Sequence, residues 1–360
     1  MDQERVRLRE AATEGVCWRR WGPYLSERQW GTVREDLSEH GNSWEDFNHD
    51  QARSRAYRWG EDGIAGLSDD KQILCFSLAL WNGADPILKE RLFGLTNSEG
   101  NHGEDVKEYY YYLDNTPTHS YMHFLYRYPQ SAYPYTDLVE TNRLRSRVEP
   151  EYELIDTGIF DGDRYFDVAV KYAKAGPEDI LIEITASNRG AAAALLHLLP
   201  HLWFRNTWSW APGGDKGLLT AGDNDEELTR VRATHPRLGD FHLCCEGRIP
   251  LLFTENETNT TRLFGQPSSS PFVKDGIHEH VVNGRDDSVN PEGMGTKVAA
   301  HYRFDLPAGE TIRVRLRLSR DRVSTPFDAT FDDVYVTRRK EADAFYARLH
   351  RTGSLPTSVW

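Results

Sequence analysis

The second half of the chain alternates between hydrophobic and polar residues with a period of two. In residues 165–172 every second side chain is hydrophobic, and residues 180–186 repeat the pattern after a Gly-Pro turn at 176–179. This spacing is typical of half-buried β-strands, and the Gly, Pro and Asn residues between them favour antiparallel pairing. The pattern predicts a mainly β fold.

Residues 302–306 and 311–319 show the same alternation on either side of a turn at 307–310. We predict that they form a β-hairpin. In the second of these strands, aliphatic side chains alternate with Arg313, Arg315 and Arg317. One buried and one solvated face is expected of a sheet on the outside of a sandwich.

The longest hydrophobic stretch is residues 191–204, which also contains His197, Pro200 and His201. It is shorter than a membrane span. Its alanines and leucines also favour a helix. We assign a strand, because strands flank it and the hairpin-turn signal at 188–190 precedes it.

The first half, from residue 18 to about 135, is irregular and rich in Gly, Asn, Asp, Trp and Tyr. Strand-like segments occur at 72–81 and 109–113, between long loops that are expected to line a site or to contact a neighbouring domain. Residues 2–12 favour a short polar helix or a frayed terminus, 338–350 have helical spacing, and 213–227 and 265–295 have the composition of surface loops.

These patterns predict a large antiparallel β-sandwich of the supersandwich type, with long loops and a C-terminal linker helix. We divide the chain into a tail at 1–17, the sandwich at 18–337 and a linker helix with its tail at 338–360. The sandwich itself has a loop-rich part at 18–150 and regular strands at 151–337.

Charge and cysteine usage limit the partners and the location. The net charge of −13 argues against nucleic acid, because phosphate binding needs a concentrated basic surface. No hydrophobic leader follows Met1, and no segment predicts a membrane span. Cys244 and Cys245 are adjacent and no CxxC spacing occurs, so we expect free thiols in the cytoplasm.

The best candidates for ligand contact combine aromatic rings with polar groups near the N-terminus. Rings suit the CH faces of a sugar, and charged groups suit its hydroxyls. The same mixture suits a tight interface between domains equally well. The candidates for substrate binding or for a domain interface are Tyr24, Glu27, Arg28, Trp30, Arg34, Glu104 and Tyr109.

No motif predicts a metal or a cofactor. His119 and His123 have i,i+4 spacing, and His278 and His280 flank a glutamate, but no HExxH pattern accompanies either pair. GxxxxGK[ST] and GxSxG are also absent. We expect these histidines to be ordinary polar or packed residues.

Several long stretches resemble the N-terminal region of the bacterial family 63 glycoside hydrolases, which are related to mannosyl-oligosaccharide glucosidase. The resemblance extends from Trp18 to about Leu349. The matching stretches are residues 21–36, 58–66, 92–105, 152–160 and 199–208.

The resemblance implies an α-glucosidase-type enzyme in which an N-terminal β-sandwich packs on an (α/α)6 barrel. In that family the barrel carries both catalytic acids and inverts the anomeric carbon. This chain ends at Trp360, about where a linker helix would lead into the barrel, so no catalytic residue is transferred to it. We expect a truncated domain that is inactive alone; a free-standing carbohydrate-binding or interaction module and a poorly soluble remnant stay open as alternatives.

Overall fold

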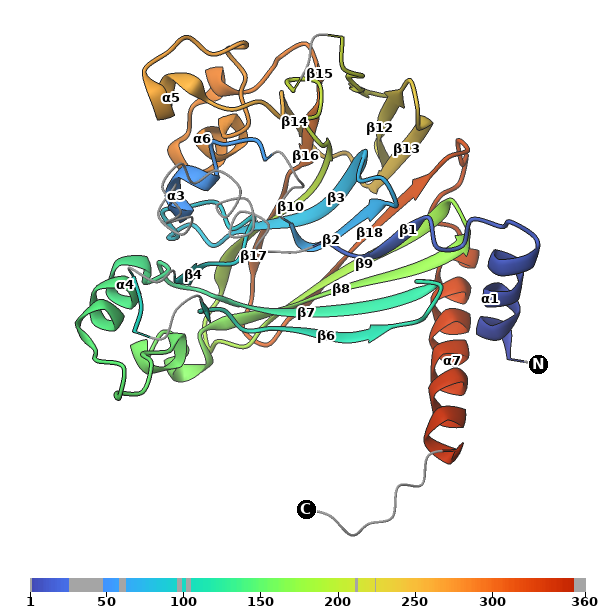
Figure 1. Ribbon diagram of the computed structural model, residues 1–360, viewed down its shortest axis with the longest axis horizontal. Coiled ribbons are helices and arrows are strands. Elements are labelled where there is room, and N and C mark those ends of the chain that lie inside the picture. Colours follow the sequence, from blue (N-terminus) through green and yellow to red (C-terminus); the bar gives the residue numbers. More distant parts are fainter. Residues whose placement is uncertain are drawn as a thin grey trace.

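Two antiparallel β-sheets form the protein, a sandwich with few helices (Figure 1). The computed structural model describes residues 2–25, 48–57, 63–95, 99–101, 105–210, 213–223 and 225–352. The predicted fold class, mainly β with a C-terminal helix, is confirmed. No helix in these ranges has the length and hydropathy needed to span a membrane.

The seven-stranded sheet has the order β1-β2-β3-β10-β16-β14, and β17 also pairs with β10. Its central strand β10 confirms the strand predicted in residues 191–204. The strands are β1 (Trp21–Tyr24), β2 (Ile64–Asp69), β3 (Leu74–Trp81), β10 (Ala194–Phe204), β14 (Leu251–Thr254), β16 (Lys297–Ala300) and β17 (Tyr302–Leu306).

The nine-stranded sheet has the order β15-β11-β12-β13-β18-β9-β8-β7-β6. The predicted turn at 176–179 joins β8 to β9 as a hairpin. The strands are β6 (Tyr110–Asn115), β7 (Tyr121–Pro129), β8 (Tyr165–Gly176), β9 (Asp179–Asn188), β11 (Leu218–Ala221), β12 (Leu228–His235), β13 (Gly239–Glu246), β15 (Met294–Gly295) and β18 (Thr311–Ser319).

The remaining elements lie at the edges and outer faces of the two sheets. The short strands β4 (Gly94–Leu95) and β5 (Asp105–Val106) pair with each other. The helices are α1 (Gln3–Thr13), α3 (His49–Ala52), α4 (Tyr135–Leu144), α5 (Thr260–Phe264), α6 (Gly276–Asn283), α7 (Ala329–Thr352) and the 3₁₀ turns η2 (Leu154–Thr157), η3 (Asp161–Asp163) and η4 (Asp286–Ser288).

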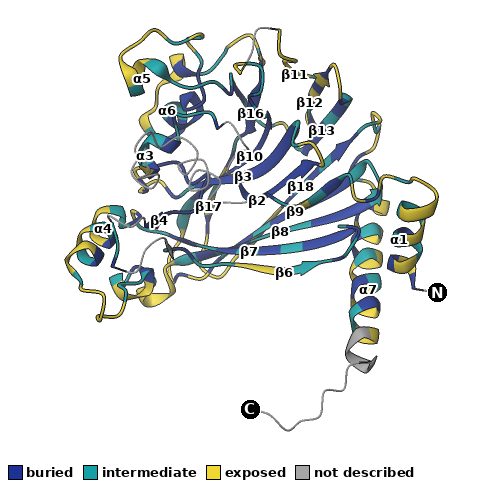
Figure 2. Ribbon diagram, viewed as in Figure 1, coloured by how far each residue is buried: buried dark blue, intermediate teal, exposed yellow. Residues whose placement is uncertain are grey.

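The hydrophobic core lies between the two sheets. Leu198 and Leu202 of β10 belong to the same buried cluster as Val168 and Tyr172 of β8. Figure 2 colours most residues of these strands as buried. The alternation seen in the sequence therefore correctly predicts which side chains of the regular strands face inward.

Two of the predicted hairpins are wrong. β17 pairs with β10 in the seven-stranded sheet, whereas β18 pairs with β9 and β13 in the nine-stranded sheet. The turn at 307–310 therefore crosses between sheets, and so does the turn at 188–190, which joins β9 to β10. Alternation fixes which face of a strand is buried, but both kinds of connection satisfy that pattern equally.

Asn188 joins the two crossings. Its side-chain amide donates to the carbonyls of Ala192 (2.8 Å) and Leu306 (2.9 Å). Its backbone N–H donates to Glu310 O, and its backbone carbonyl accepts from Gly309 N. Because Asn188 is almost wholly buried, these bonds tie both corners together away from water.

The segments predicted as surface loops are partly ordered elements. Residues 265–295 contain α6, whose Ile277 and Val281 pack with Leu199 of β10 on the outer face of the seven-stranded sheet. Residues 213–227 contain β11. The Gly and Asp residues of these segments form the turns between the elements. Their number made the short hydrophobic faces of the elements hard to recognise in the sequence.

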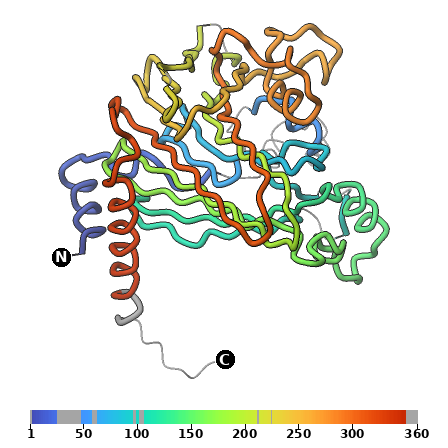
Figure 3. Tube along the Cα trace, turned by 180° about the vertical axis from the view of Figure 1, so that it is seen from behind, coloured from blue at the N-terminus to red at the C-terminus, as the bar shows by residue number. Residues whose placement is uncertain are grey.

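The helix predicted at 338–350 is longer than expected, because α7 begins at Ala329. It packs on the outer face of the nine-stranded sheet through Phe331, Tyr335 and Ala342. Figures 1 and 3 show α1 beside α7 from opposite sides of the molecule.

Candidate functional site

A small polar cavity lies on the outer face of the seven-stranded sheet. The strand register brings its side chains together: His201 is opposite Ser77 of β3, and Trp203 is opposite Lys297 of β16. The cavity has a volume of about 20 Å³ and is also lined by Glu90, Arg91 and Lys274. We call it the Glu90 cavity.

The charged residues of the Glu90 cavity are buried. Lys297 Nζ lies 2.8 Å from a Glu90 carboxylate oxygen, and Arg91 Nη2 lies 3.1 Å from the other. Each of these three residues is less than a tenth exposed. Taking such charges out of water is costly and is offset only by close pairing. A cluster of this kind is therefore a candidate for function.

The charge states follow from burial and from neighbouring charges. Burial alone would raise the pKa of Glu90, but the attraction of Lys297 and Arg91 outweighs it and holds that pKa well below its usual range. Burial and the positive charge of Lys297 lower the pKa of His201 to about 3. Glu90 is thus ionised and His201 is a neutral imidazole at pH 7.

The loops over the cavity are held by direct polar contacts. Lys274 Nζ donates to the Arg55 carbonyl at 2.7 Å and lies 4.0 Å from the centre of the Tyr57 ring. His278 on α6 accepts from the backbone N–H of Leu88 at 3.1 Å. The outer face of the sheet is therefore closed by residues distant in sequence.

Two polar side chains of the cavity lack hydrogen-bond partners within the described part of the chain. Both ring nitrogens of His201 and the indole nitrogen of Trp203 are buried and unbonded. Such groups are rare in folded proteins and call for an unseen partner.

A second buried charge cluster lies where the loop before β4 meets β7. Lys89 Nζ and a Glu108 oxygen are 2.7 Å apart, and both side chains are inaccessible. Tyr126 donates to Glu108 at 2.7 Å, and the Phe93 N–H donates at 3.0 Å. Burial raises the pKa of nearby Asp85 to about 6. These bonds fix the loop against the sheet.

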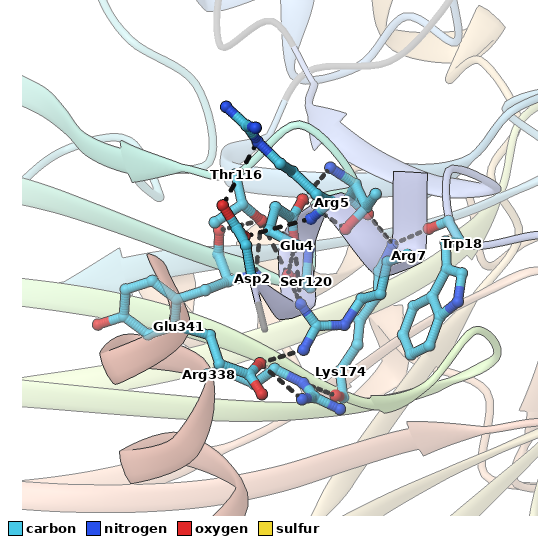
Figure 4. A network of polar contacts seen from close by, with 12 residues as sticks. Asp2, Glu4, Arg5, Arg7, Trp18, Thr116, Ser120, Lys174, Arg338 and Glu341 are labelled. Atoms are coloured by element: carbon cyan, nitrogen blue, oxygen red, sulfur yellow. Dashed lines mark hydrogen bonds and ion pairs between the residues drawn. The ribbon is translucent and has the colours of Figure 1, made fainter. Parts of the chain in front are cut away.

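A third network joins both ends of the chain (Figure 4). Glu4 on α1 is inaccessible and accepts from the Thr118 backbone N–H at 2.6 Å and from Ser120 Oγ at 2.7 Å. Arg7 connects Glu4 to Glu341 on α7. The hydrogen bonds from Thr118 and Ser120 outweigh burial and lower the pKa of Glu4.

Lys174 and Arg338 continue this network into the nine-stranded sheet (Figure 4). The Lys174 ammonium donates to the carbonyls of Trp18 and Trp21, each at 2.6 Å. Arg338 donates to the Lys174 carbonyl at 2.7 Å and pairs with Glu341 at 2.8 Å. The network fixes α1 and α7 to the same sheet.

Only two of the residues predicted from the sequence can be placed. Tyr24 packs against Tyr112 (ring centroids 4.6 Å apart) where β1 meets β6, and it donates to the Asp114 carbonyl. Tyr109 packs against Phe160 in a separate cluster near α4. The structure does not bring these two together. The other predicted residues lie outside the described residues: Glu27, Arg28, Trp30, Arg34 and Glu104.

The residues that flank two of the undescribed stretches lie at the Glu90 cavity. Leu25, before residues 26–47, packs with Trp203. Tyr57, before residues 58–62, lies against Lys274. Gly63, after them, is so close to Ser77 that an added Cβ would lie 2.6 Å from the Ser77 Cβ.

The histidine pairs form no metal site within the described ranges, where no group of three or more metal-binding side chains occurs. His119 lies in the turn before β7 and contacts Asn115, and His123 is on β7. His278 and His280 lie on α6, which corrects the loop expected there. Their spacing reflects local packing.

The sequence analysis missed the Glu90 cavity. Its charged residues come from distant segments, and no motif links them. One local signal existed: Lys89, Glu90 and Arg91 interrupt the hydrophobic residues 87–93. Three charges in such a run indicate either a surface turn or buried ion pairs, and only the fold decides between them.

No family model matches the chain. It is 41% identical, over 388 aligned positions, to the uncharacterized protein YMR196W of Saccharomyces cerevisiae, with 96% of this chain and 36% of that protein covered. The chain thus spans about a third of this relative's length. It is also similar to a solved galactose mutarotase related enzyme from Lactobacillus acidophilus, at 8% identity and a TM-score of 0.30, covering 68% of this chain and 87% of that one.

Proposed function

We propose that this chain is the non-catalytic β-sandwich of a glycosidase of the family 63 type, with α-glucosidase-like activity in the whole enzyme. In this proposal the sandwich packs on an (α/α)6 catalytic domain and shapes its substrate pocket. The resemblance, which extends from Trp18 to about Leu349, supports the family, and the yeast relative is long enough for a further domain.

The observation that carries the proposal is an exposed hydrophobic edge continuous with α7. Tyr111, Tyr112 and Leu113 of β6 are 40–51% exposed, at the last strand of the nine-stranded sheet. The next residues of β6 reach α7, because the Tyr346 hydroxyl donates to the Asn115 carbonyl at 2.7 Å. Adjacent exposed aromatic side chains are typical of interaction surfaces.

The rigidity of α7 supports the same proposal. The 24-residue helix is about 36 Å long and is fixed by the buried Glu4–Arg7–Glu341 network. A domain docked along α7 and β6 would be held in one orientation toward the sandwich. A substrate pocket shared between two domains requires such an orientation.

Activity assays test the proposal. We expect the full-length yeast relative to hydrolyse 4-nitrophenyl α-D-glucopyranoside and the purified chain to give the rate of the enzyme-free blank. Turnover by the chain alone would contradict a non-catalytic role if it persists in Asp240→Asn, an exposed-face control, and disappears in Glu90→Gln while circular dichroism shows that variant to be folded.

A free-standing carbohydrate-binding module is the second candidate, favoured by the same exposed tyrosines of β6. Aromatic faces of this kind stack on sugar rings. Saturable binding of maltose that Tyr111→Ala removes, and that Trp210→Ala leaves unchanged, would favour this candidate. The non-catalytic sandwich predicts no saturable binding of maltose in the wild type or in either variant.

A further inference from the structure

The Glu90 cavity has a size that decides what it can hold. Its volume of about 20 Å³ exceeds the roughly 10–15 Å³ that one water molecule needs. A sugar ring is several times larger. Since the lining residues are all buried, the space suits one small polar group.

The unbonded groups beside the cavity define the chemistry of that group. Trp203 offers only a donor, whereas the neutral imidazole of His201 offers one donor and one acceptor. An anion can only accept, so it leaves the imidazole acceptor unbonded. A cation cannot accept from the indole N–H of Trp203, and the ammonium of Lys297 repels it. A hydroxyl group both donates and accepts.

We propose that the Glu90 cavity is a binding site for one hydroxyl group, which accepts from the indole N–H of Trp203 and donates to a ring nitrogen of His201. The hydroxyl comes either from an internal water molecule or from a sugar. The sugar source rests on the proposed function, whereas the water source does not.

The position of the site gives the bound group a structural consequence. Trp203 also contacts Leu25, and Ser77 contacts Gly63, so the cavity lies beneath residues that flank both 26–47 and 58–62. A hydroxyl bound here satisfies buried groups at that junction. Its loss leaves the Trp203 indole N–H and that His201 ring nitrogen unbonded, at a cost for each group.

A high-resolution crystal structure of the full chain tests the proposal. We expect one density peak within hydrogen-bond distance of Trp203 Nε1 and of a His201 ring nitrogen. A second crystal soaked in methyl α-D-glucopyranoside separates the sources: an unchanged isolated peak identifies water, and density continuous with a sugar identifies a sugar hydroxyl. An empty cavity in both crystals overturns the proposal.

Matched variants add a second readout. Trp203→Phe removes the indole donor and should abolish the peak, whereas Trp21→Phe removes a buried unbonded indole elsewhere and should leave it. A peak that survives in Trp203→Phe at full occupancy contradicts the assigned contact.

Nitrogen chemical shifts of His201 should show a neutral ring at pH 6 in the wild type, and a charged ring would contradict the assigned acceptor. α-Glucoside turnover by the chain would overturn the proposed function and leave the water result intact.

Discussion

The two sheets differ in what lies on their outer faces. In the seven-stranded sheet, β10 is buried at every position from Leu196 to Phe204, because α6 and its loops cover the second face. In the nine-stranded sheet, β18 alternates between buried and partly exposed positions. The inner faces of both strands belong to the same core. The difference in burial between β10 and β18 therefore comes from what covers their outer faces.

Charges on the two outer faces are therefore under different constraints. Arg315 and Arg317 of β18 pair with Glu246 and Asp179 at a face that water reaches. Glu90 and Lys297 pair where water does not. An ion pair on the open face contributes little, whereas a covered pair is strongly destabilised when one partner is lost.

Glu90→Gln should therefore produce the largest effect. It leaves the Lys297 ammonium and the Arg91 guanidinium buried without their carboxylate, which should cost about 3–5 kcal/mol of unfolding free energy. Asp240→Asn, which weakens the exposed pair with Arg232 on the nine-stranded sheet, should cost less than about 1 kcal/mol. Urea unfolding measures both, and equal losses would remove the distinction between the faces.

Leu199→Ala tests how firmly the outer face of the seven-stranded sheet is packed, without changing any charge. Leu199 is inaccessible beneath α6, so the cavity left behind should cost about 2–4 kcal/mol. Thr185→Ala, on the outer face of β9, should cost under about 1 kcal/mol. If Leu199→Ala costs no more than Thr185→Ala, α6 does not pack firmly on the sheet.

Acid should weaken the seven-stranded sheet through its neutral histidines. The pKa of His201 is about 3 in the fold and about 6.5 when unfolded, so between these values the unfolded chain binds the extra proton. The stability contributed by His201 is complete above pH 6.5 and is lost as the pH falls toward 3.

Urea unfolding at pH 7.0, 5.5 and 4.5 measures this loss. His201→Gln should make stability fall less steeply with acid than in the wild type. His242→Gln, on β13 of the nine-stranded sheet, is the control and should change the slope less, since His242 is only partly buried. A steeper fall in His201→Gln would show that the sign is wrong.

Arg232→Ala should have the smallest effect. Arg232 and Asp240 pair on the nine-stranded sheet at 2.6 Å but are 55% and 42% exposed. Water and salt screen such a pair, so its loss should change the free energy of unfolding by under about 0.5 kcal/mol. A loss above 1 kcal/mol would show that ion pairs on the outer face of the nine-stranded sheet contribute to stability much as the buried pairs of the seven-stranded sheet do.

The sequence predicts where the strands lie in the chain better than it predicts which strands pair with one another. Alternation around Val168 and Leu316 reveals the buried side of β8 and β18, because that side depends on local spacing. The crossings at 188–190 and 307–310 depend on which sheet each strand joins. The residues of a turn do not indicate whether the next strand joins the same sheet or the other one. α6 was missed since its hydrophobic face is only Ile277, Val281 and their neighbours.

The candidate site was beyond prediction for a related reason. Glu90 and Lys297 are more than two hundred positions apart, and His201 belongs to a stretch that is otherwise typical of a buried strand. Tyr24, one of the predicted candidates, packs against Tyr112 at the edge of the sandwich. A sequence shows the chemistry of each residue, but the pairing register of the strands decides which residues lie next to one another.

The double corner held by Asn188 makes the two layers inseparable during unfolding. Since the chain passes from one layer to the other at both crossings, neither layer is a continuous segment that could survive alone. Melting followed by far-UV circular dichroism and by tryptophan fluorescence should thus coincide in one transition. Replacing the Asn188 amide by a leucine side chain would remove the hydrogen bonds to Ala192 and Leu306, and would therefore loosen both corners at once.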